Sequence, residues 1–354
     1  MTNPLLDKFN TPFDSIPFSK IKDEDYEPAF KTALEEARRE VDEICKKPEK
    51  PTFKNTVEAL EISGEKLGIV SSAFFNLLHA ETNENMQETA QIVSPLLSEF
   101  SNDIRLNPVL FERIKSVYEN KESFNLNPEQ IRLLEKSYRN FSRNGANLPD
   151  DKKEKLREID KQLAKLKLDF GQNVLAETND FELHLTDEND LEGLPDFVVE
   201  QAKHEAETKE KEGWIFTLHA PSYIPFMTYS SNRELRKKMN LAYGKRAFQN
   251  NEHNNEEIVK SIARLRLERA QLLGYQSHAD FVLEERMANS PKIVKGFLND
   301  LLSKSKKFGE RDVNEIREFA KQTDGIEDLQ KWDHAYYAEK LKKQKFDFSA
   351  EELK

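Results

Sequence analysis

The feature that most constrains the fold is a long charged segment that carries one apolar stripe. Apolar side chains recur there three and four residues apart, at Leu156, Ile159, Leu163, Leu166 and Phe170. This spacing places them on one face of an α-helix, with the lysines and glutamates between them on the solvent face. Because the heptad pattern is short, we expect the helix to pack antiparallel against another helix of the chain rather than in a free coiled coil.

Helical patterns dominate the remaining sequence as well. The chain has only 11 glycines in 354 residues, and Glu, Lys, Leu and Ala are abundant, which favours helices. One helix is predicted to begin at Asn55, where Asn55 and Glu58 resemble a capping box. The prolines of PSYIPF (221–226) are predicted to interrupt the helices. Other helices are predicted over residues 26–45, 87–104, 108–120, 128–145, 231–248, 256–273, 277–287, 291–321 and 328–343.

Two short stretches change to a period of two residues, which is typical of strands. Apolar side chains alternate with others in DFELHLTD (180–187) and in GWIFTLHA (213–220). We predict that they form a small β-hairpin whose connection contains a helix over residues 195–210. The predicted fold is mainly α, a multi-helix lobe with one small β-hairpin.

The clearest internal break is NGANLPDD (144–151), in which a glycine and a proline lie close together. It predicts a division into residues 1–148, an N-terminal helical region with an extended arm, and residues 149–354. The second part holds the long helix, the hairpin and the later helices.

Charge and composition exclude several functional classes. The chain carries 54 basic and 65 acidic side chains, a net charge of -11, so its surface repels phosphate backbones and we expect no nucleic-acid partner. Cys45 is the sole cysteine, which excludes an intrachain disulfide and a cysteine-based zinc site. The first residues lack the pattern of a signal peptide, and no run of eighteen apolar residues occurs. We therefore expect a cytoplasmic protein with no membrane partner.

Histidines could build a metal site, but their spacing does not support one. A zinc-peptidase helix needs His-Glu-x-x-His, and His204-Glu205 is followed by Thr208 where the second His should be. Its surroundings predict a solvated helix face. His79 is predicted to be a satisfied histidine at the edge of a buried run. His184 and His219 lie on the predicted hairpin, but two histidines alone make a weak metal site.

Two other groups of residues have alternative interpretations. Trp332, Tyr336 and Tyr337 near His334 either form a binding surface or fill a helical core, and the core is favoured. Five helical arginines either bind a substrate carboxylate or tie helices together through surface ion pairs, and the ion pairs are favoured. They are Arg233, Arg236, Arg264, Arg266 and Arg269. We name no catalytic residue and no metal ligand, and the substrate-binding residues stay unknown.

Several long blocks, in the same order from about Pro12 to Lys354, nevertheless resemble one family. They resemble the N-terminal half of a thimet-oligopeptidase-type (M3 family) zinc metallopeptidase, nearest the bacterial peptidyl-dipeptidase and oligopeptidase A branch. The blocks are KNTVEALEISGEKLGIVSSAFFNLLHAETN, GQNVLAETNDFELHL, APSYIPFMTYSSNRELRKKMNLAYGKRA, RLRLERAQLLGYQSHADFVLEERMANSP and LQKWDHAYYAEKLKK.

The resemblance implies an almost entirely helical ellipsoid of two lobes, with a channel that admits short peptides. It also implies a zinc helix C-terminal to the Trp-Asp-His-x-Tyr-Tyr block, which is matched here by Trp332–Tyr337. The chain stops soon after this block, in SAEELK, where Ser349 and Glu352 form a capping box that begins a helix. We therefore expect a truncated chain that lacks the zinc-binding part.

These expectations leave two hypotheses. In the first, the longer parent protein is a zinc metallopeptidase that hydrolyses short peptides, as a peptidyl-dipeptidase or an oligopeptidase. Zinc is then expected for the full-length parent and none in this fragment, which should be inactive alone. Its partners would be short peptides and the missing C-terminal half of the same chain. In the second hypothesis, the protein is a non-catalytic, all-helical peptide-binding or scaffold protein.

Overall fold

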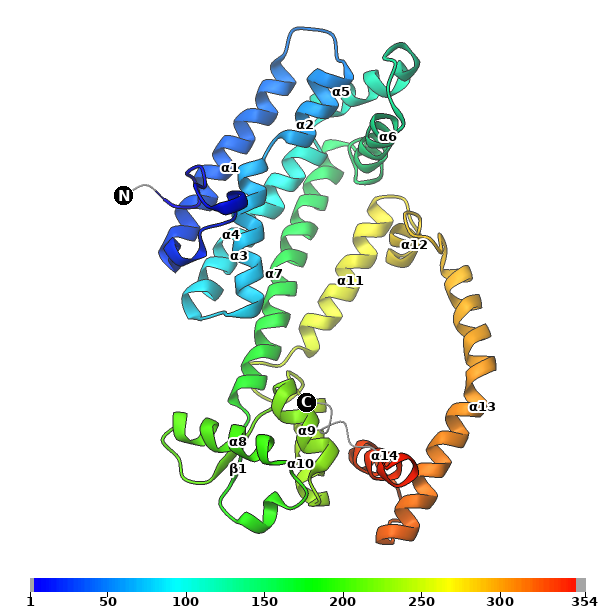
Figure 1. Cartoon of the computed structure of the whole chain (residues 1–354). Coiled ribbons are helices and arrows are strands. Elements are labelled where there is room, and N and C mark those ends of the chain that lie inside the picture. The colour runs from blue at the N-terminus through cyan, green and yellow to red at the C-terminus, as the bar shows by residue number, and fades with distance from the viewer. Residues whose placement is uncertain (1–2, 348–354) are drawn as a thin grey trace. The chain divides into compact units, whose positions relative to one another are not determined.

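The computed structural model describes residues 3–347. The chain divides into two compact units, each built from two stretches of sequence: unit 1 holds residues 1–169 and 260–282, and unit 2 holds 170–259 and 283–354. Helices make up most of both units (Figure 1). The prediction of a mainly α fold with one small hairpin is confirmed. The predicted division of the chain into residues 1–148 and 149–354 stays a prediction. The capping box predicted at Ser349 lies outside the described residues.

Unit 1 is a helical assembly around several apolar clusters. The largest cluster joins α1, α3 and α4, and its centre is a group of aromatic rings in which Phe74 contacts Tyr26 and Phe30 edge to face. Its helices are α1 (Asp23–Lys46), α2 (Ala59–Ile62), α3 (Glu65–Ala80), α4 (Glu84–Arg105), α5 (Pro108–Glu119), α6 (Pro128–Arg143), the first part of α7 (Asp150–Asp180), most of α11 (Glu256–Leu272) and α12 (His278–Leu283).

The apolar stripe of the charged segment lies on α7, as predicted. Leu156, Ile159 and Leu163 are buried, and the last two pack against Leu265 of α11 in one cluster. Helix–helix packing of the stripe within the chain is therefore confirmed. Phe170, its last predicted member, is exposed instead.

The helix predicted to begin at Asn55 begins earlier. A π-helical turn spans Phe53–Glu58, and its N-cap is Thr52, whose hydroxyl accepts a hydrogen bond from the Asn55 amide (3.1 Å). The Asn55 side chain in turn accepts one from the Thr52 amide (2.8 Å). The capping box is thus Thr52 with Asn55, and the predicted pair of Asn55 with Glu58 is wrong.

Unit 2 contains the hairpin and the later helices. β1 and β2 pair antiparallel, with Leu183 opposite Phe216 and Leu185 opposite Trp214, so the predicted hairpin is confirmed. Leu183 and Phe216 are buried against α8 and α9. Besides the end of α7 and the start of α11, the elements are β1 (Leu183–Leu185), α8 (Asp196–Thr208), β2 (Trp214–Phe216), α9 (Ala220–Tyr229), α10 (Arg233–Gly244), α13 (Pro291–Asp324) and α14 (Lys331–Phe346).

The hairpin requires a glycine at position 213. Gly213 has φ +88°, and a Cβ there would lie 2.2 Å from the carbonyl oxygen of Leu185. We expect Gly213→Ala to lower the free energy of unfolding by about 1–3 kcal/mol, because both the backbone strain and the clash with main chain must be relieved. Chemical denaturation measures the change. Gly244→Ala at the end of α10 is the control, since nothing lies within 4 Å of its Cβ position; equal losses in both variants would contradict the prediction.

The stretch PSYIPF is helical, contrary to prediction. It forms most of α9, in which Pro221 lies in the first turn and Pro225 lies inside the helix. A proline in the first turn forfeits no hydrogen bond, whereas one in the interior removes a single bond. The burial of Phe226 and Met227 in the cluster under the hairpin compensates for that loss.

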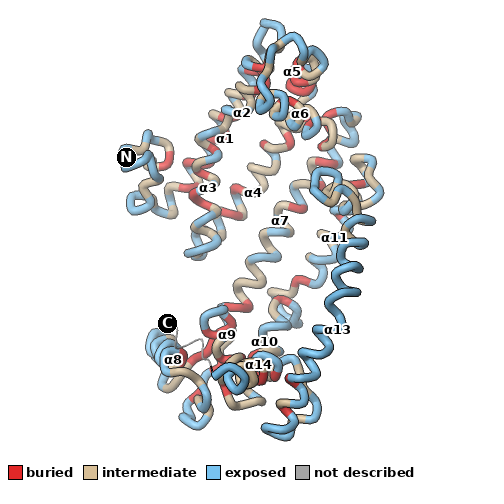
Figure 2. The backbone as a smooth tube through the Cα atoms, turned by 45° about the vertical axis from the view of Figure 1, so that its right-hand side comes forward, coloured by how far each residue is buried: buried red, intermediate tan, exposed pale blue. Residues whose placement is uncertain are grey.

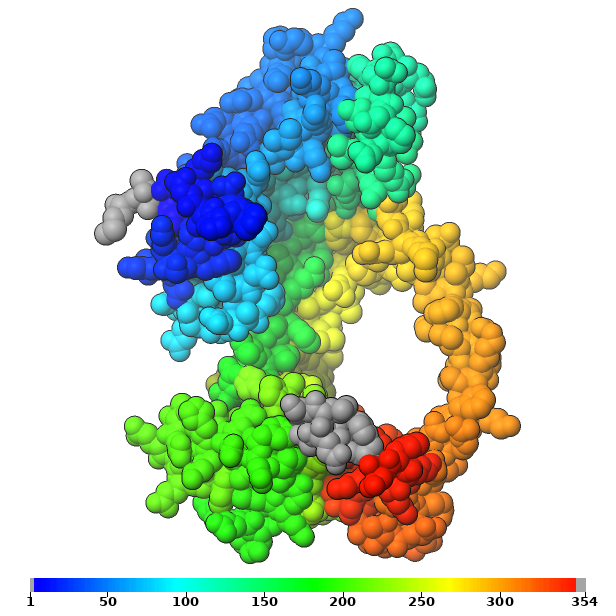
Figure 3. Space-filling view, in the orientation of Figure 1, coloured from blue at the N-terminus to red at the C-terminus, as the bar shows by residue number. Residues whose placement is uncertain are grey.

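Helix α13 differs from the other long helices in its exposure. Its C-terminal part packs on α14 through Ile316 and Ala320, but most of its length is exposed (Figure 2). In the space-filling view α13 is the segment drawn in orange (Figure 3). The exposed apolar side chains of α13 are Ile293, Phe297, Leu298, Leu301, Leu302, Phe308 and Val313.

Candidate functional site

The most developed polar site of unit 2 is centred on Asp333 at the start of α14. Asp333 is the third helical residue, and its carboxylate accepts a hydrogen bond from the amide of Gln330, the N-cap (3.0 Å). This is the acidic half of a capping box, which explains locally why the side chain turns back over the first turn. The side chain of Asp333 is fully buried, so its charge needs partners.

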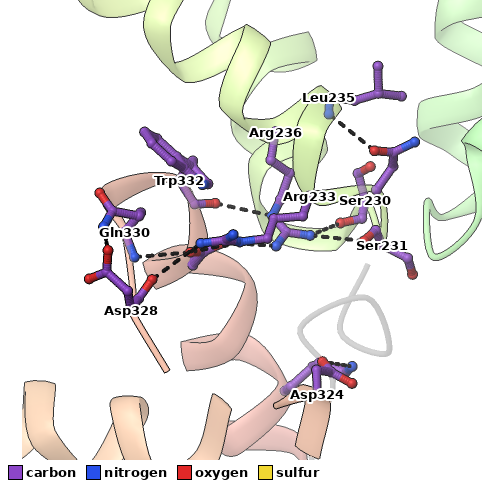
Figure 4. A network of polar contacts seen from close by, with 12 residues as sticks. Ser230, Ser231, Arg233, Leu235, Arg236, Asp324, Asp328, Gln330 and Trp332 are labelled. Atoms are coloured by element: carbon purple, nitrogen blue, oxygen red, sulfur yellow. Dashed lines mark hydrogen bonds and ion pairs between the residues drawn. The ribbon is translucent and has the colours of Figure 1, made fainter. Parts of the chain in front are cut away.

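The partners are two arginines of α10. Arg233 and Arg236 are three residues apart and therefore share one face of the helix. Arg233 donates from Nη2 to Oδ2 of Asp333 (2.7 Å) and from Nε to Oδ1 (3.0 Å), a two-pronged contact. Arg236 donates from Nη2 to Oδ1 (3.1 Å). Figure 4 shows both guanidinium groups extending from α10 toward the start of α14.

Arg236 is the more deeply placed of the two arginines, with only 1% of its side chain exposed. Its remaining hydrogens go to backbone carbonyls: Nε donates to Trp332 (3.1 Å) and Nη1 donates to Ser230 (2.7 Å). The guanidinium also lies over the ring of Tyr336, 4.1 Å from its centroid, a cation–π contact. Arg236 thus joins the loop before α10 to the first turns of α14.

The surroundings of Asp333 favour the ionised form of its carboxyl group. Burial alone would raise the pKa of Asp333, but the hydrogen bonds from Arg233, the Gln330 amide and Arg236 together hold this pKa below its ordinary value. The hydrogen bond to Asp333 raises the pKa of Arg233, with burial opposing it. Burial and the nearby Asp324 raise the pKa of Tyr337. At neutral pH Asp333 is therefore ionised, and the nearby phenol of Tyr337 is neutral.

A pocket of about 500 Å³ lies beside this network within unit 2. Helix α14 contributes Tyr336, Glu339, Lys340 and Lys343 to its wall, and the loop before α8 contributes Gly193. Opposite charges on one wall suit a polar or zwitterionic group. Because the Arg236 network fixes Tyr336, the α14 wall is held in place by buried ion pairs.

The histidines do not come together. His204 is exposed, which confirms the predicted solvated face. His79 is exposed too, so its predicted place at a buried edge is wrong. His184 contacts the carbonyl of Glu212 (2.6 Å), while His219 contacts Asn179 (3.0 Å). Within residues 3–347, no group of three or more His, Cys, Asp or Glu side chains could hold a metal ion.

The aromatic block and the arginines behave largely as predicted. Tyr336 and Tyr337 are buried in the cluster between α13 and α14, which confirms the core interpretation for these two. Trp332 is only half-buried and packs against the cluster under the hairpin. Arginines do tie helices together, as Arg269 does through Asp160 (2.6 Å). The prediction of surface pairs is wrong for Arg236, whose side chain and partner are buried. It is wrong for Arg269 too, since its side chain and that of Asp160 are only 12% and 15% exposed.

Asp333, the centre of the site, was not predicted from the sequence to be a functional residue. Two signals were present in the sequence: Arg-x-x-Arg at the start of one helix, and an acidic residue three positions after a helix start at Gln330. Neither reveals that the two helices meet. That information lies in the packing of α10 and α14.

The network lies in a part of the chain that matches a known family. Residues 226–354, which include α10, α13 and α14, match Peptidase family M3. The resemblance predicted from the sequence is confirmed, and the chain is a relative of M3 peptidases.

The similarity extends along the whole chain. Oligopeptidase A of Escherichia coli is 35% identical over 358 residues, which cover 100% of this chain and 52% of that relative. Dipeptidyl carboxypeptidase of Escherichia coli is 31% identical over 353 residues (99% and 52%). Saccharolysin of Saccharomyces cerevisiae is 27% identical over 322 residues (87% and 43%). The chain therefore spans about half the length of the curated relatives it matches.

Within the described residues, no helix is both long enough and apolar enough to cross a membrane.

Proposed function

We propose that the chain is the N-terminal part of a zinc metallopeptidase that hydrolyses short peptides. The observation that supports this most strongly is the continuous similarity of all 354 residues to Oligopeptidase A. The names of the relatives include an oligopeptidase and a dipeptidyl carboxypeptidase. Internal cleavage and release of C-terminal dipeptides are therefore both within the proposed activity.

The residues present here do not fit a zinc site. The sequence has no His-Glu-x-x-His, and the described residues hold no group of three metal ligands. We therefore assign no step of hydrolysis to them and propose that the zinc ligands follow the Trp332–Tyr337 block in the parent. The role proposed for this chain is to form a helical lobe and part of the peptide channel.

We propose that the exposed face of α13 contacts the C-terminal half of the parent. Seven large exposed apolar side chains on one helix are more than scattered surface residues require. The relatives are about twice as long as this chain, so they contain enough additional sequence to cover it. For location we propose the cytoplasm, which agrees with one relative named as a probable cytosolic oligopeptidase A.

Two measurements test the proposal together. Mass spectrometry of the native protein should find peptides beyond Lys354 that include His-Glu-x-x-His. A native product that ends at Lys354 would instead favour the non-catalytic peptide-binding or scaffold protein.

The isolated 354-residue chain should not hydrolyse a quenched-fluorescence peptide, whereas the longer parent should do so in a chelator-sensitive way. Without the zinc and a base to activate water, no nucleophile is available. The parent with its motif Glu replaced by Gln is the matched control for contaminating peptidases. Chelator-sensitive cleavage by the isolated chain would overturn the proposed division of roles.

A further inference from the structure

Unit 1 contains a basic pocket to which the proposed peptidase activity assigns no role. The pocket has a volume of about 390 Å³ and is bounded by α4, α7, α11 and α12. Its charged walls are Arg105 of α4, Asp160 and Lys167 of α7, and Arg266 and Arg269 of α11. All of these helical stretches belong to the same compact unit.

The spacing of residues along each helix explains why polar groups gather there. Ser98, Ser101 and Arg105 are three and four residues apart and share one face of α4. Arg266 and Arg269, three apart, do the same on α11. Ile159 and Leu163 of α7 pack against α11 through apolar contacts. The polar residues of α4 and α11 therefore lie beside an apolar contact between helices and not in open solvent.

The pocket is strongly positive within an acidic protein. The chain as a whole carries a net charge of -11, yet four cationic side chains and a single carboxylate, Asp160, line this pocket. That carboxylate is already paired, since Arg269 donates to it from Nε (2.6 Å). Most of the positive charge of the pocket therefore has no counter-charge in its walls.

The two central arginines differ in how they are held. Arg269 is oriented in advance by Asp160, by Asn144 (3.3 Å) and by the ring of Phe281 (5.2 Å). Arg105 lies partly buried, and the described part of the chain gives it no hydrogen bond or ion pair. Burial, and then the charge of Arg269, lower the pKa of Arg105, and the charge of Asp160 opposes this only in part. A guanidinium remains charged even so, and Asp160 is already paired with Arg269, so a bound anion would supply the charge that Arg105 lacks.

His278 adds a second group without a partner. Its Nδ1 atom is buried and makes no hydrogen bond, which costs free energy unless a ligand or water satisfies it. Burial lowers the pKa of His278 first, followed by the charges of Arg266, Arg269 and Lys167. The imidazole is therefore neutral at pH 7 while the pocket is empty. A bound anion would offset the three neighbouring charges and raise this pKa.

We propose that the pocket binds a small oxyanion with two or more negative charges, of which a phosphate group is the best match. Guanidinium groups donate pairs of hydrogen bonds to phosphate oxygens, and Ser98 and Ser101 supply hydroxyl donors at the same wall. The volume of the pocket leaves room for an organic group beside the phosphate. The ligand is therefore free phosphate or a small phosphate ester.

Calorimetric titration of the 354-residue chain with inorganic phosphate tests the proposal, with sodium chloride at the same ionic strength as the comparison. We expect saturable binding of phosphate and none of chloride. Arg105→Gln should weaken phosphate binding by about tenfold or more, because one charged donor is lost. The stability of the ligand-free chain should change little in this variant, since Arg105 makes no hydrogen bond or ion pair with the described residues. The variant removes both the repulsion from Arg269 and the weaker attraction to Asp160.

Arg264→Gln is the matched control. Arg264 also lies on α11 but is exposed, pairs with Glu268 (3.1 Å) and does not line the pocket. It should bind phosphate as the unsubstituted chain does. Phenyl phosphate binding more tightly than inorganic phosphate would identify an ester as the ligand, whereas the reverse order would identify free phosphate.

NMR titration of His278 distinguishes phosphate binding by Arg105 from a purely structural role of Arg105, because only bound phosphate would change the pKa of His278. Its pKa should rise when phosphate is added and should stay unchanged in Arg105→Gln at the same phosphate concentration. Phosphate binding no tighter than chloride binding, or equal losses in Arg105→Gln and Arg264→Gln, would overturn the proposal. Neither result bears on peptide hydrolysis, so the two proposals fail separately.

Discussion

Replacing Asp333 by Leu should lower the free energy of unfolding of the chain by about 3–5 kcal/mol. The substitution removes the only carboxylate that contacts Arg236 in the described structure, and it leaves that guanidinium buried. Loss of one member of a buried ion pair is costly because the other charge stays out of water without compensation. Arg233, which is 35% exposed, can turn to solvent and contributes less to the loss.

The double variant Asp333→Leu with Arg236→Met separates the ion pair from simple loss of packing. With both charges removed, the site holds apolar side chains of similar size, and we expect the double variant to be more stable than Asp333→Leu alone. Chemical denaturation of the four proteins in this cycle measures the coupling. A double variant that is less stable than either single one would contradict the ion-pair account.

A surface pair in the same unit is the control. Asp300 and Lys304 of α13 form an ion pair (2.7 Å) with both side chains largely exposed. Asp300→Asn should therefore change the stability by only about 0.5 kcal/mol or less. If this variant lost as much as Asp333→Leu, burial would not be the origin of the effect.

The contribution of Asp333 should also depend on pH in a defined direction. Its pKa in the folded chain lies below the ordinary value of 3.8. A group of this kind stabilises the fold above its unfolded pKa, and its contribution disappears as the pH falls through the folded pKa. The stability difference between the unsubstituted chain and Asp333→Leu should thus be constant near neutral pH and shrink in acid.

Periodicity was sufficient to predict most elements of the fold. The stripe at Leu156, Ile159 and Leu163 predicts α7 because a period of 3.6 residues has few alternatives over such a length. The period of two residues around Leu183 and Trp214 predicts the hairpin, because such alternation is typical of strands. Two local predictions were wrong. The helix start was placed at Asn55, although Thr52 is the N-cap of this turn. Helix α9 was not predicted because it contains Pro225, which removes a helical hydrogen bond; burial in the tertiary structure offsets this loss, and a local pattern does not show that burial.

The sites depend on contacts between distant positions, which periodicity does not reveal. Asp333 and Arg236 are 97 residues apart, and Asp160 and Arg269 are 109 apart. Each residue taken alone resembles one of many surface charges in a chain that is 34% charged. Only the packing of α10 on α14 buries the first pair, and only the packing of α7 on α11 takes most of the second pair out of solvent.

The exposed face of α13 should behave differently in this chain and in the longer parent protein. Phe297 and Leu301, one helical turn apart, are 62% and 45% exposed. In the isolated chain, Phe297→Lys with Leu301→Lys should change the free energy of unfolding by only about 0.5 kcal/mol, because neither side chain is buried. The same double variant should reduce the fluorescence of a bound hydrophobic dye, since a contiguous apolar patch is interrupted.

In the parent, the same substitutions should cost about 1.5–3 kcal/mol per side chain, because the face would there be buried against the C-terminal half. Phe13→Lys with Ile62→Lys is the matched control, as both residues are exposed but belong to unit 1 rather than to α13. This control should leave the free energy of unfolding of the isolated chain and of the parent unchanged. The decisive measurement compares the loss of unfolding free energy that the α13 variant causes in the parent with the loss in the isolated chain. Equal, small losses in both would mean that α13 is not covered in the parent. Its apolar face would then need another partner.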